Sequence, residues 1–138
     1  SEETIKELAK DLTHYLKGGE IIYLYGEMGV GKTTFVRYLI NQFQKNKKLH
    51  ITEVTSPTFN LLNEYDINDL VIKHYDLFRL KDESEITNLD LFENNQSTIT
   101  LIEWPQLISK NKSIKTIDLI FSYENELNNR SVKIDGLN

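Results

Sequence analysis

Cysteine is absent from this 138-residue chain, which excludes a disulfide scaffold, a zinc ribbon, an iron–sulfur site and a thiol nucleophile. The three histidines are widely spaced at positions 14, 50 and 74, so a histidine-built metal site is not expected. No apolar run approaches the roughly 20 residues that span a bilayer. The acidic start at residues 1–4 is unlike a secretory or mitochondrial leader. We therefore expect a cytoplasmic protein.

Basic residues are outnumbered, with 16 Lys and Arg against 21 Asp and Glu and a formal net charge of -5. Because phosphate neutralisation needs a basic face, this balance argues against a protein that grips nucleic acid with its whole surface. The 39% hydrophobic and 27% charged content is typical of a folded globular protein. We expect one domain over residues 1–138.

Hydrophobic spacing predicts amphipathic helices over residues 1–16 and 32–44. The continuous apolar run at residues 21–25 is typical of a strand that is buried on both faces. Asp82 and Glu85 resemble a capping box that starts a short helix to about Glu93. Further strands are expected near residues 51–55, 58–65, 71–77, 98–102, 115–123 and 131–134, with a turn at 66–69. This order predicts an α/β fold, with a mixed central sheet flanked by helices.

The strongest motif lies at residues 26–33, which read Gly-Glu-Met-Gly-Val-Gly-Lys-Thr and fit the phosphate-binding loop pattern in full. The predicted strand before it and the predicted helix after it are the context that the motif requires. Its glycines let the backbone N–H groups curl around an anion. Lys32 can reach the β- and γ-phosphates, and Thr33 offers a hydroxyl to Mg²⁺. The motif predicts a nucleotide site with Mg²⁺.

A carboxylate at the end of a neighbouring strand is needed to hold the Mg²⁺ of such a site. Two candidates exist, since residues 98–102 run into Glu103 and residues 71–75 run into Asp76. A carboxylate at the carboxyl end of a core strand points into the crevice where α/β sheets bind ligands. The alternative for either residue is an acid at a strand end that faces solvent.

Two further absences bear on the substrate. The guanine-reading Asn-Lys-x-Asp pattern is missing, which favours ATP over GTP. Arginine occurs only at positions 37, 79 and 130, so the arginine-rich lid of a small-molecule kinase is not apparent. A small-molecule P-loop kinase and a nucleotide-dependent binding switch remain as alternatives to an ATPase.

Three motifs follow the P-loop in order: Thr-Ser-Pro-Thr-Phe at residues 55–59, His-Tyr-Asp-Leu-Phe-Arg-Leu at 74–80 and Leu-Ile-Glu-Trp-Pro at 101–105. With the P-loop, this combination resembles the TsaE family of bacterial P-loop ATPases over nearly the whole chain. The resemblance implies an ATP-hydrolysing subunit, cytoplasmic, that acts on a TsaB–TsaD protein complex in making tRNA N6-threonylcarbamoyladenosine. The net charge of -5 predicts that tRNA is engaged only through those partners, and the scarcity of arginine predicts that hydrolysis by the lone chain is slow.

The resemblance also implies roles for individual residues. Thr33 and Glu103 would hold Mg²⁺, and the catalytic residues would be Lys32, Asp76 and Thr58. The N-terminal segment and the region before the late arginine would approach the nucleotide base. The residues expected to bind the nucleotide are Glu2, Gly29, Val30, Gly31, Lys32, Thr33, Thr34 and Asn129.

Several side chains near these motifs also have plainer interpretations. Trp104 is either a core or interface aromatic or a wall of the nucleotide crevice. His74 is interpreted as a buried strand histidine in preference to a proton shuttle. Tyr65, Tyr75 and Phe78 are interpreted as core residues in preference to a base-stacking platform. Lys32 is expected to supply charge to phosphates and no core packing.

Overall fold

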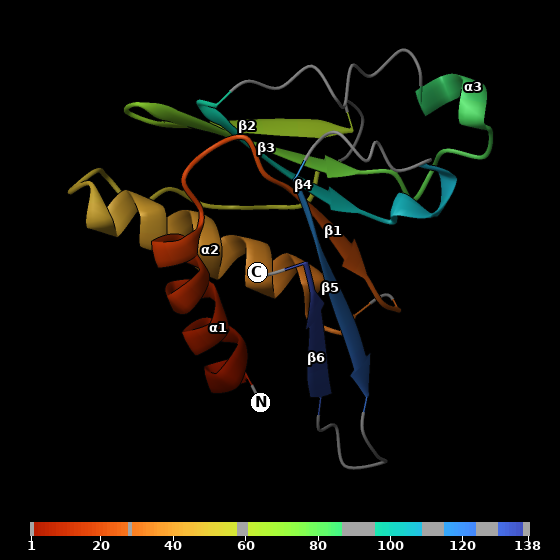
Figure 1. The fold of residues 1–138 in the computed structure, drawn as a ribbon, viewed down its shortest axis with the longest axis horizontal. Coiled ribbons are helices and arrows are strands. Elements are labelled where there is room, and N and C mark those ends of the chain that lie inside the picture. Colours follow the sequence, from red (N-terminus) through yellow and green to blue (C-terminus); the bar gives the residue numbers. More distant parts are fainter. Residues whose placement is uncertain are drawn as a thin grey trace.

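The structure, a computed structural model, describes residues 2–27, 29–57, 61–86, 96–108, 115–123 and 130–136 (Figure 1). Its helices and strands are, in chain order, α1 (Glu2–Tyr15), β1 (Ile21–Tyr25), α2 (Lys32–Asn46), β2 (Leu62–Ile67), β3 (Leu70–Asp76), α3 (Glu83–Ile86), β4 (Thr98–Glu103), β5 (Thr116–Tyr123) and β6 (Arg130–Asp135). A short 3₁₀ helix, Pro105–Leu107, follows β4. Within these described ranges, no helix is both long enough and apolar enough to cross a membrane.

The strands form one six-stranded sheet in the order β2-β3-β4-β1-β5-β6. The four central strands β3, β4, β1 and β5 run parallel to one another. The edge strands β2 and β6 pair antiparallel with β3 and β5. The predicted α/β fold with a mixed central sheet is therefore confirmed.

Helices α1 and α2 lie side by side on one face of this sheet (Figure 1). In α1, the buried apolar side chains are Ile5, Ala9 and Leu12, which are spaced by four and three residues, as an amphipathic helix requires. The residues of the two helices that are buried in the main core are Ile5, Ala9, Leu12, Phe35, Val36, Leu39, Ile40 and Phe43. They pack on the strand residues of the same face, so burial of apolar surface fixes α2 over the centre of the sheet.

Most elements lie close to where the sequence predicts them. The strand at residues 21–25 and the two long helices are confirmed, with α2 ending at Asn46. The closing hairpin is confirmed as the antiparallel pair β5 and β6, and residues 124–129 between them lie outside the described residues. The short helix begins at Glu83 as predicted, where the Asp82 carboxylate accepts the N–H of Ser84 at 3.0 Å. Its predicted continuation beyond residue 86 lies outside the described residues.

The predicted strand at residues 51–55 is wrong. This segment is irregular and joins no strand of the sheet. Side chains of α2 take the place of a strand partner: the Asn41 amide donates to the Thr52 carbonyl at 3.1 Å, and the Gln44 amide donates to the Thr52 hydroxyl at 2.8 Å. The β-like composition was therefore outweighed by contacts with a helix.

Of the strand predicted at residues 58–65, residues 58–60 lie outside the described residues, and the described strand is β2, Leu62–Ile67. β2 begins at Leu62 because Leu61 has a φ of 63°, a left-handed conformation that interrupts an extended chain. It continues to Ile67, so the turn to β3 consists of Asn68 and Asp69 alone. Asn68 has a φ of 61°, which asparagine tolerates better than most residues.

The carboxyl ends of three parallel strands meet at one edge of the sheet. Glu103, the last residue of β4, pairs in register with Leu24 of β1 on one side and with Asp76 of β3 on the other. Beyond β1 the chain turns directly into α2. Since ligands of open α/β sheets bind at this edge, the fold brings the predicted P-loop and both predicted carboxylates together.

Candidate functional site

The P-loop turn between β1 and α2 depends on glycines. Gly26 has a φ of 143°, and a Cβ there would lie 2.8 Å from the carbonyl oxygen of Phe121. Gly31 is the N-cap of α2 with a φ of 118°, and no side-chain cap hydrogen bond satisfies this end of the helix. The first-turn N–H groups of α2 therefore stay available to an anion, which the helix dipole also favours.

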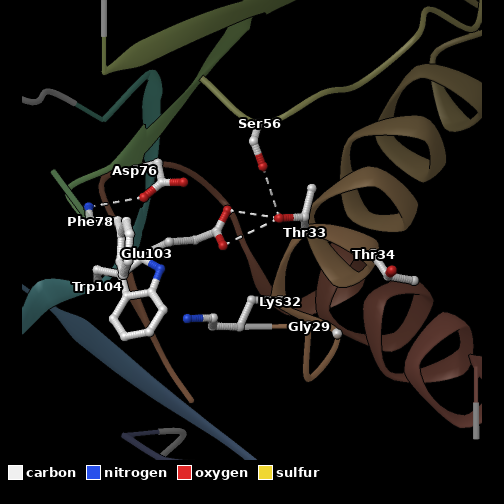
Figure 2. Close-up of a pocket in the computed structure, with 10 residues that line it drawn as sticks. Gly29, Lys32, Thr33, Thr34, Ser56, Asp76, Phe78, Glu103 and Trp104 are labelled. Carbon is white, nitrogen blue, oxygen red and sulfur yellow. Dashed lines mark hydrogen bonds between the residues drawn. The ribbon is translucent and has the colours of Figure 1, made fainter. Parts of the chain in front are cut away.

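Lys32, the first residue of α2, is almost fully buried, with 4% of its surface exposed. Its ammonium donates to the Gly26 carbonyl at 2.6 Å and lies 3.6 Å from the centre of the Trp104 ring (Figure 2). Burial lowers the pKa of Lys32, and the carboxylates of Glu103 and Asp76 partly offset this effect. The contacts that bury Lys32 therefore involve its ammonium, which lies between the Gly26 carbonyl and the face of Trp104.

Thr33 of α2 makes side-chain contacts with two other segments of the chain. Its Oγ1 lies 3.3 Å from each carboxylate oxygen of Glu103 and 3.1 Å from the hydroxyl of Ser56 (Figure 2). Glu103 comes from β4 and is 3% exposed, and Ser56 comes from the irregular segment before β2. The hydroxyl and carboxylate that the sequence assigned to Mg²⁺ are therefore adjacent in the folded chain.

His74 of β3 lies behind this pair. Its Nε2 is 2.6 Å from Oε2 of Glu103, and the imidazole is fully buried. The interpretation as a buried strand histidine is confirmed. Its hydrogen bond to the carboxylate is not visible in the sequence, because the two residues are 29 positions apart.

Asp76 lines the same cavity from the end of β3, beside Glu103 (Figure 2). Its Oδ1 accepts the backbone N–H of Phe78 at 3.0 Å. Burial raises the pKa of Asp76, the Phe78 N–H opposes this effect, and Glu103 adds to it. The carboxyl of Asp76 is thus a stronger base than an aspartate in water.

This raised pKa gives a prediction for stability. Folding favours the protonated carboxyl of Asp76, so its stabilising effect is present below the unfolded pKa of about 3.9 and is lost as pH rises through the folded pKa. Asp76→Asn removes the charge and keeps an acceptor for Phe78. Thermal unfolding across pH should show the variant more stable than the parent near pH 8, with the difference vanishing in acid. A difference that is constant with pH would contradict this.

The residues above surround one cavity of about 370 Å³. It is lined by Gly29, Gly31, Lys32, Thr33, Thr34, Ser56, Asp76, Phe78, Glu103 and Trp104. Phe78 and Trp104 contact each other, with ring centroids 4.9 Å apart. Both interpretations of Trp104 apply, because it is a wall of the cavity and also packs against a second buried hydrophobic cluster. The interpretation of Phe78 as a core residue is wrong, since it is 53% exposed, whereas Tyr75 is buried as predicted.

Some residues assigned to the nucleotide are not among those lining the cavity. Val30 is fully buried in the main core, and its N–H donates to the Glu27 carbonyl at 3.2 Å. The Glu2 carboxylate accepts a hydrogen bond from the Tyr38 hydroxyl at 2.6 Å and pairs with Arg37 on α2. Thr58 and Asn129 lie outside the described residues.

The P-loop makes one contact that the sequence did not predict. The hydroxyl of Tyr123, at the end of β5, donates to the Gly29 carbonyl at 3.1 Å. This bond connects the end of β5 to the P-loop turn and occupies the Gly29 carbonyl. No local signal marks Tyr123, because it is 94 positions away from Gly29.

The donor set at Thr33 and Glu103 fits Mg²⁺. Mg²⁺ prefers oxygen ligands and usually keeps several waters, with one or two carboxylates and substrate phosphates completing its shell. Among the described residues, no group of three or more His, Cys, Asp or Glu side chains could hold a metal by itself. One hydroxyl, one carboxylate and an open cavity match an ion that is shared with a phosphate ligand.

Comparisons with known proteins agree with this geometry. The sequence profile of the family described as "Threonylcarbamoyl adenosine biosynthesis protein TsaE" matches residues 1–132. Relatives named "tRNA threonylcarbamoyladenosine biosynthesis protein TsaE" include one from Rickettsia conorii, 44% identical over 108 residues, or 78% of this chain and 59% of the relative. One from Bacillus subtilis is 37% identical over 109 residues, or 78% of this chain and 65% of the relative. The matched part of the chain therefore spans less than two thirds of the length of either relative.

A solved structure has the same fold. The crystal structure of YdiB from Bacillus subtilis superposes with a TM-score of 0.68, covering 97% of this chain and 79% of that chain. The sequence identity is 22%, so this likeness supports the architecture alone.

Proposed function

Because the chain belongs to the TsaE family of threonylcarbamoyl adenosine biosynthesis proteins, we propose that it binds and hydrolyses ATP in the modification of tRNA. The relatives carry that biosynthesis in their names. Its proposed target is a TsaB–TsaD protein complex, on which it acts by a nucleotide-dependent rearrangement.

One observation carries the proposal: the P-loop turn, the Lys32 ammonium and the Thr33–Glu103 pair open onto a single cavity. The uncapped N–H groups of α2 and the buried charge of Lys32 favour a phosphate chain there. Thr33 and Glu103 would hold Mg²⁺, which neutralises charge on the phosphates when it is bound. ATP is favoured over GTP because the guanine-reading motif is missing.

Asp76 is the proposed base for the attacking water. As water attacks the γ-phosphorus and ADP leaves, the Asp76 carboxylate accepts the proton of the water. Its raised pKa suits this role, because a base works best when its pKa approaches the working pH. Lys32 withdraws from its contact with the Gly26 carbonyl to stabilise charge on the transferred phosphoryl group. Thr58 remains a predicted contact of the γ-phosphate, and Glu2 and Asn129 remain predicted contacts of the base.

The proposed role of partner proteins rests on the net negative charge of the chain and on the lack of an arginine among the described residues that line the cavity. The net charge of -5 disfavours direct capture of tRNA, so tRNA would be engaged through partner proteins in the cytoplasm. None of the described residues that line the cavity is an arginine. A partner protein could supply such a residue, as happens in other P-loop enzymes.

A product assay tests the proposal against the kinase alternative. Incubation with Mg²⁺ and γ-labelled ATP should release inorganic phosphate, and added small metabolites should not become labelled. Labelling of a metabolite at a rate above phosphate release would favour a kinase.

Glu103→Gln should weaken Mg²⁺-dependent nucleotide binding more than Asp76→Asn does. The Glu103 carboxylate lies 3.3 Å from the Thr33 hydroxyl, whereas the Asp76 carboxylate accepts a hydrogen bond from the backbone N–H of Phe78. We expect the Mg²⁺ concentration for half-maximal ATP binding to rise roughly tenfold or more in Glu103→Gln, comparable to the loss of a metal's outer partners. Equal Mg²⁺ dependence in Glu103→Gln and the parent would remove Glu103 from the metal site.

A further inference from the structure

His74 makes only one of the two hydrogen bonds that an imidazole can make. Nε2 lies 2.6 Å from the Glu103 carboxylate, and Nδ1 is buried without a hydrogen-bond partner among the described residues. The residue is 0% exposed in the middle of β3, where its same-face neighbour Ile72 is apolar. A buried polar atom without a partner lowers stability, so packing alone would favour an aliphatic residue at this position.

The bond that His74 does make constrains the orientation of the carboxylate. A carboxylate that binds Mg²⁺ is ionised and can only accept hydrogen bonds, so a metal-binding Glu103 requires His74 to donate its Nε2–H. With Oε2 held from behind, rotation of the carboxylate about its Cγ–Cδ bond is restricted, and both oxygens stay 3.3 Å from the Thr33 hydroxyl. The bonds continue from Thr33 to Ser56 and so connect β3, β4, α2 and the irregular segment.

We propose that His74 is a positioning residue for the metal site: its Nε2–H holds Glu103 in the orientation that binds Mg²⁺ together with Thr33. The inference rests on the proposed function, since it concerns the same cavity. Groups that orient a metal-binding side chain from behind typically contribute 10–100-fold to metal affinity. His74 acts through Glu103 and does not itself line the cavity.

Two substitutions separate the hydrogen bond from the polarity of the side chain. A glutamine at position 74 can place its amide nitrogen near the position of Nε2, whereas an asparagine is too short to reach Glu103. His74→Gln therefore keeps the donor, and His74→Asn keeps a buried polar group but loses the bond. Thr100→Val is the matched control, because Thr100 is also buried on β4 with a hydroxyl that has no partner among the described residues.

The experiment measures binding of a fluorescent ATP analogue as Mg²⁺ is titrated, and again in excess EDTA. His74→Asn should need roughly 10–100 times more Mg²⁺ for half-maximal tightening than the parent does. Its affinity in EDTA should match that of the parent, a result that general damage to the fold would not give. His74→Gln should return to within about threefold of the parent, and Thr100→Val should match it.

Three results would overturn the inference: an unchanged Mg²⁺ requirement in His74→Asn, equal weakening in His74→Asn and His74→Gln, or an equal loss of affinity with and without Mg²⁺. Failure of the proposed function is distinguishable from these, because it would appear in the parent protein as no Mg²⁺-dependent binding of the analogue.

Discussion

Lys32→Ala is expected to lower the rate of ATP hydrolysis by a factor on the order of 10²–10³, the usual cost of removing one preorganised group that stabilises transition-state charge. Lys32 is the cation of the P-loop, and it is held in the cavity by the Gly26 carbonyl and the face of Trp104. Alanine removes this positive charge and introduces no other group that could stabilise the phosphoryl charge. Steady-state phosphate release at saturating Mg²⁺ and ATP measures the effect.

The fold should survive this substitution. Burial lowers the pKa of Lys32, so keeping its charge in the cavity costs free energy, and alanine removes that cost. Circular dichroism and the unfolding midpoint should therefore stay close to those of the parent. Lys133→Ala is the matched control, because the Lys133 side chain is 72% exposed on the edge strand β6. Loss of the folded spectrum in Lys32→Ala would mean that the residue is chiefly structural.

Addition of the TsaB–TsaD complex is expected to raise the ATPase rate by about tenfold or more. Among the described residues that line the cavity, Lys32 is the only cation, so charge that develops on the phosphoryl group would be compensated by Lys32, the N–H groups of α2 and bound Mg²⁺. An arginine that a partner inserts into a P-loop site adds about 10³–10⁵ in rate, which sets the upper bound. The measurement is phosphate release as the partner complex is titrated against a fixed amount of this chain.

Two controls accompany the partner titration. Lys32→Ala should show no stimulation, and the isolated chain should not bind tRNA at physiological salt. Full-speed hydrolysis by the lone chain, or tight tRNA binding without partners, would contradict the proposed division of labour between this chain and its partners.

The P-loop was predictable because all of its determinants are local. An apolar strand, a glycine-rich turn and an amphipathic helix follow one another within residues 21–46, and the structure has them in that order. Glu103 and Asp76 were predictable as strand ends for the same reason. Their relative distances from Thr33 were not, because strand order and register are set by pairing between distant segments.

Contacts made across the fold account for the errors. The segment at residues 51–55 has strand-like residues, yet side chains of α2 donate hydrogen bonds to the backbone carbonyl and the hydroxyl of Thr52. Phe78 follows an apolar run and was assigned to the core. In the folded chain, Asp76 accepts the N–H of Phe78, which turns the backbone at the end of β3 and leaves the ring at the cavity.

His74 illustrates the same limit at the site itself. A histidine within an apolar strand is indistinguishable, in sequence, from one that merely fills space. Its partner Glu103 becomes visible only when β3 and β4 are placed next to each other, with His74 opposite Leu101 and Asp76 opposite Glu103.

Calorimetric titration of ATP into the parent chain tests the central claim most directly, with Mg²⁺ present and in excess EDTA. The account predicts saturable binding at one site, tightened by Mg²⁺, weaker for GTP and weakened in Lys32→Ala. Absence of ATP binding by the parent, or equal binding by the parent and Lys32→Ala, would contradict it.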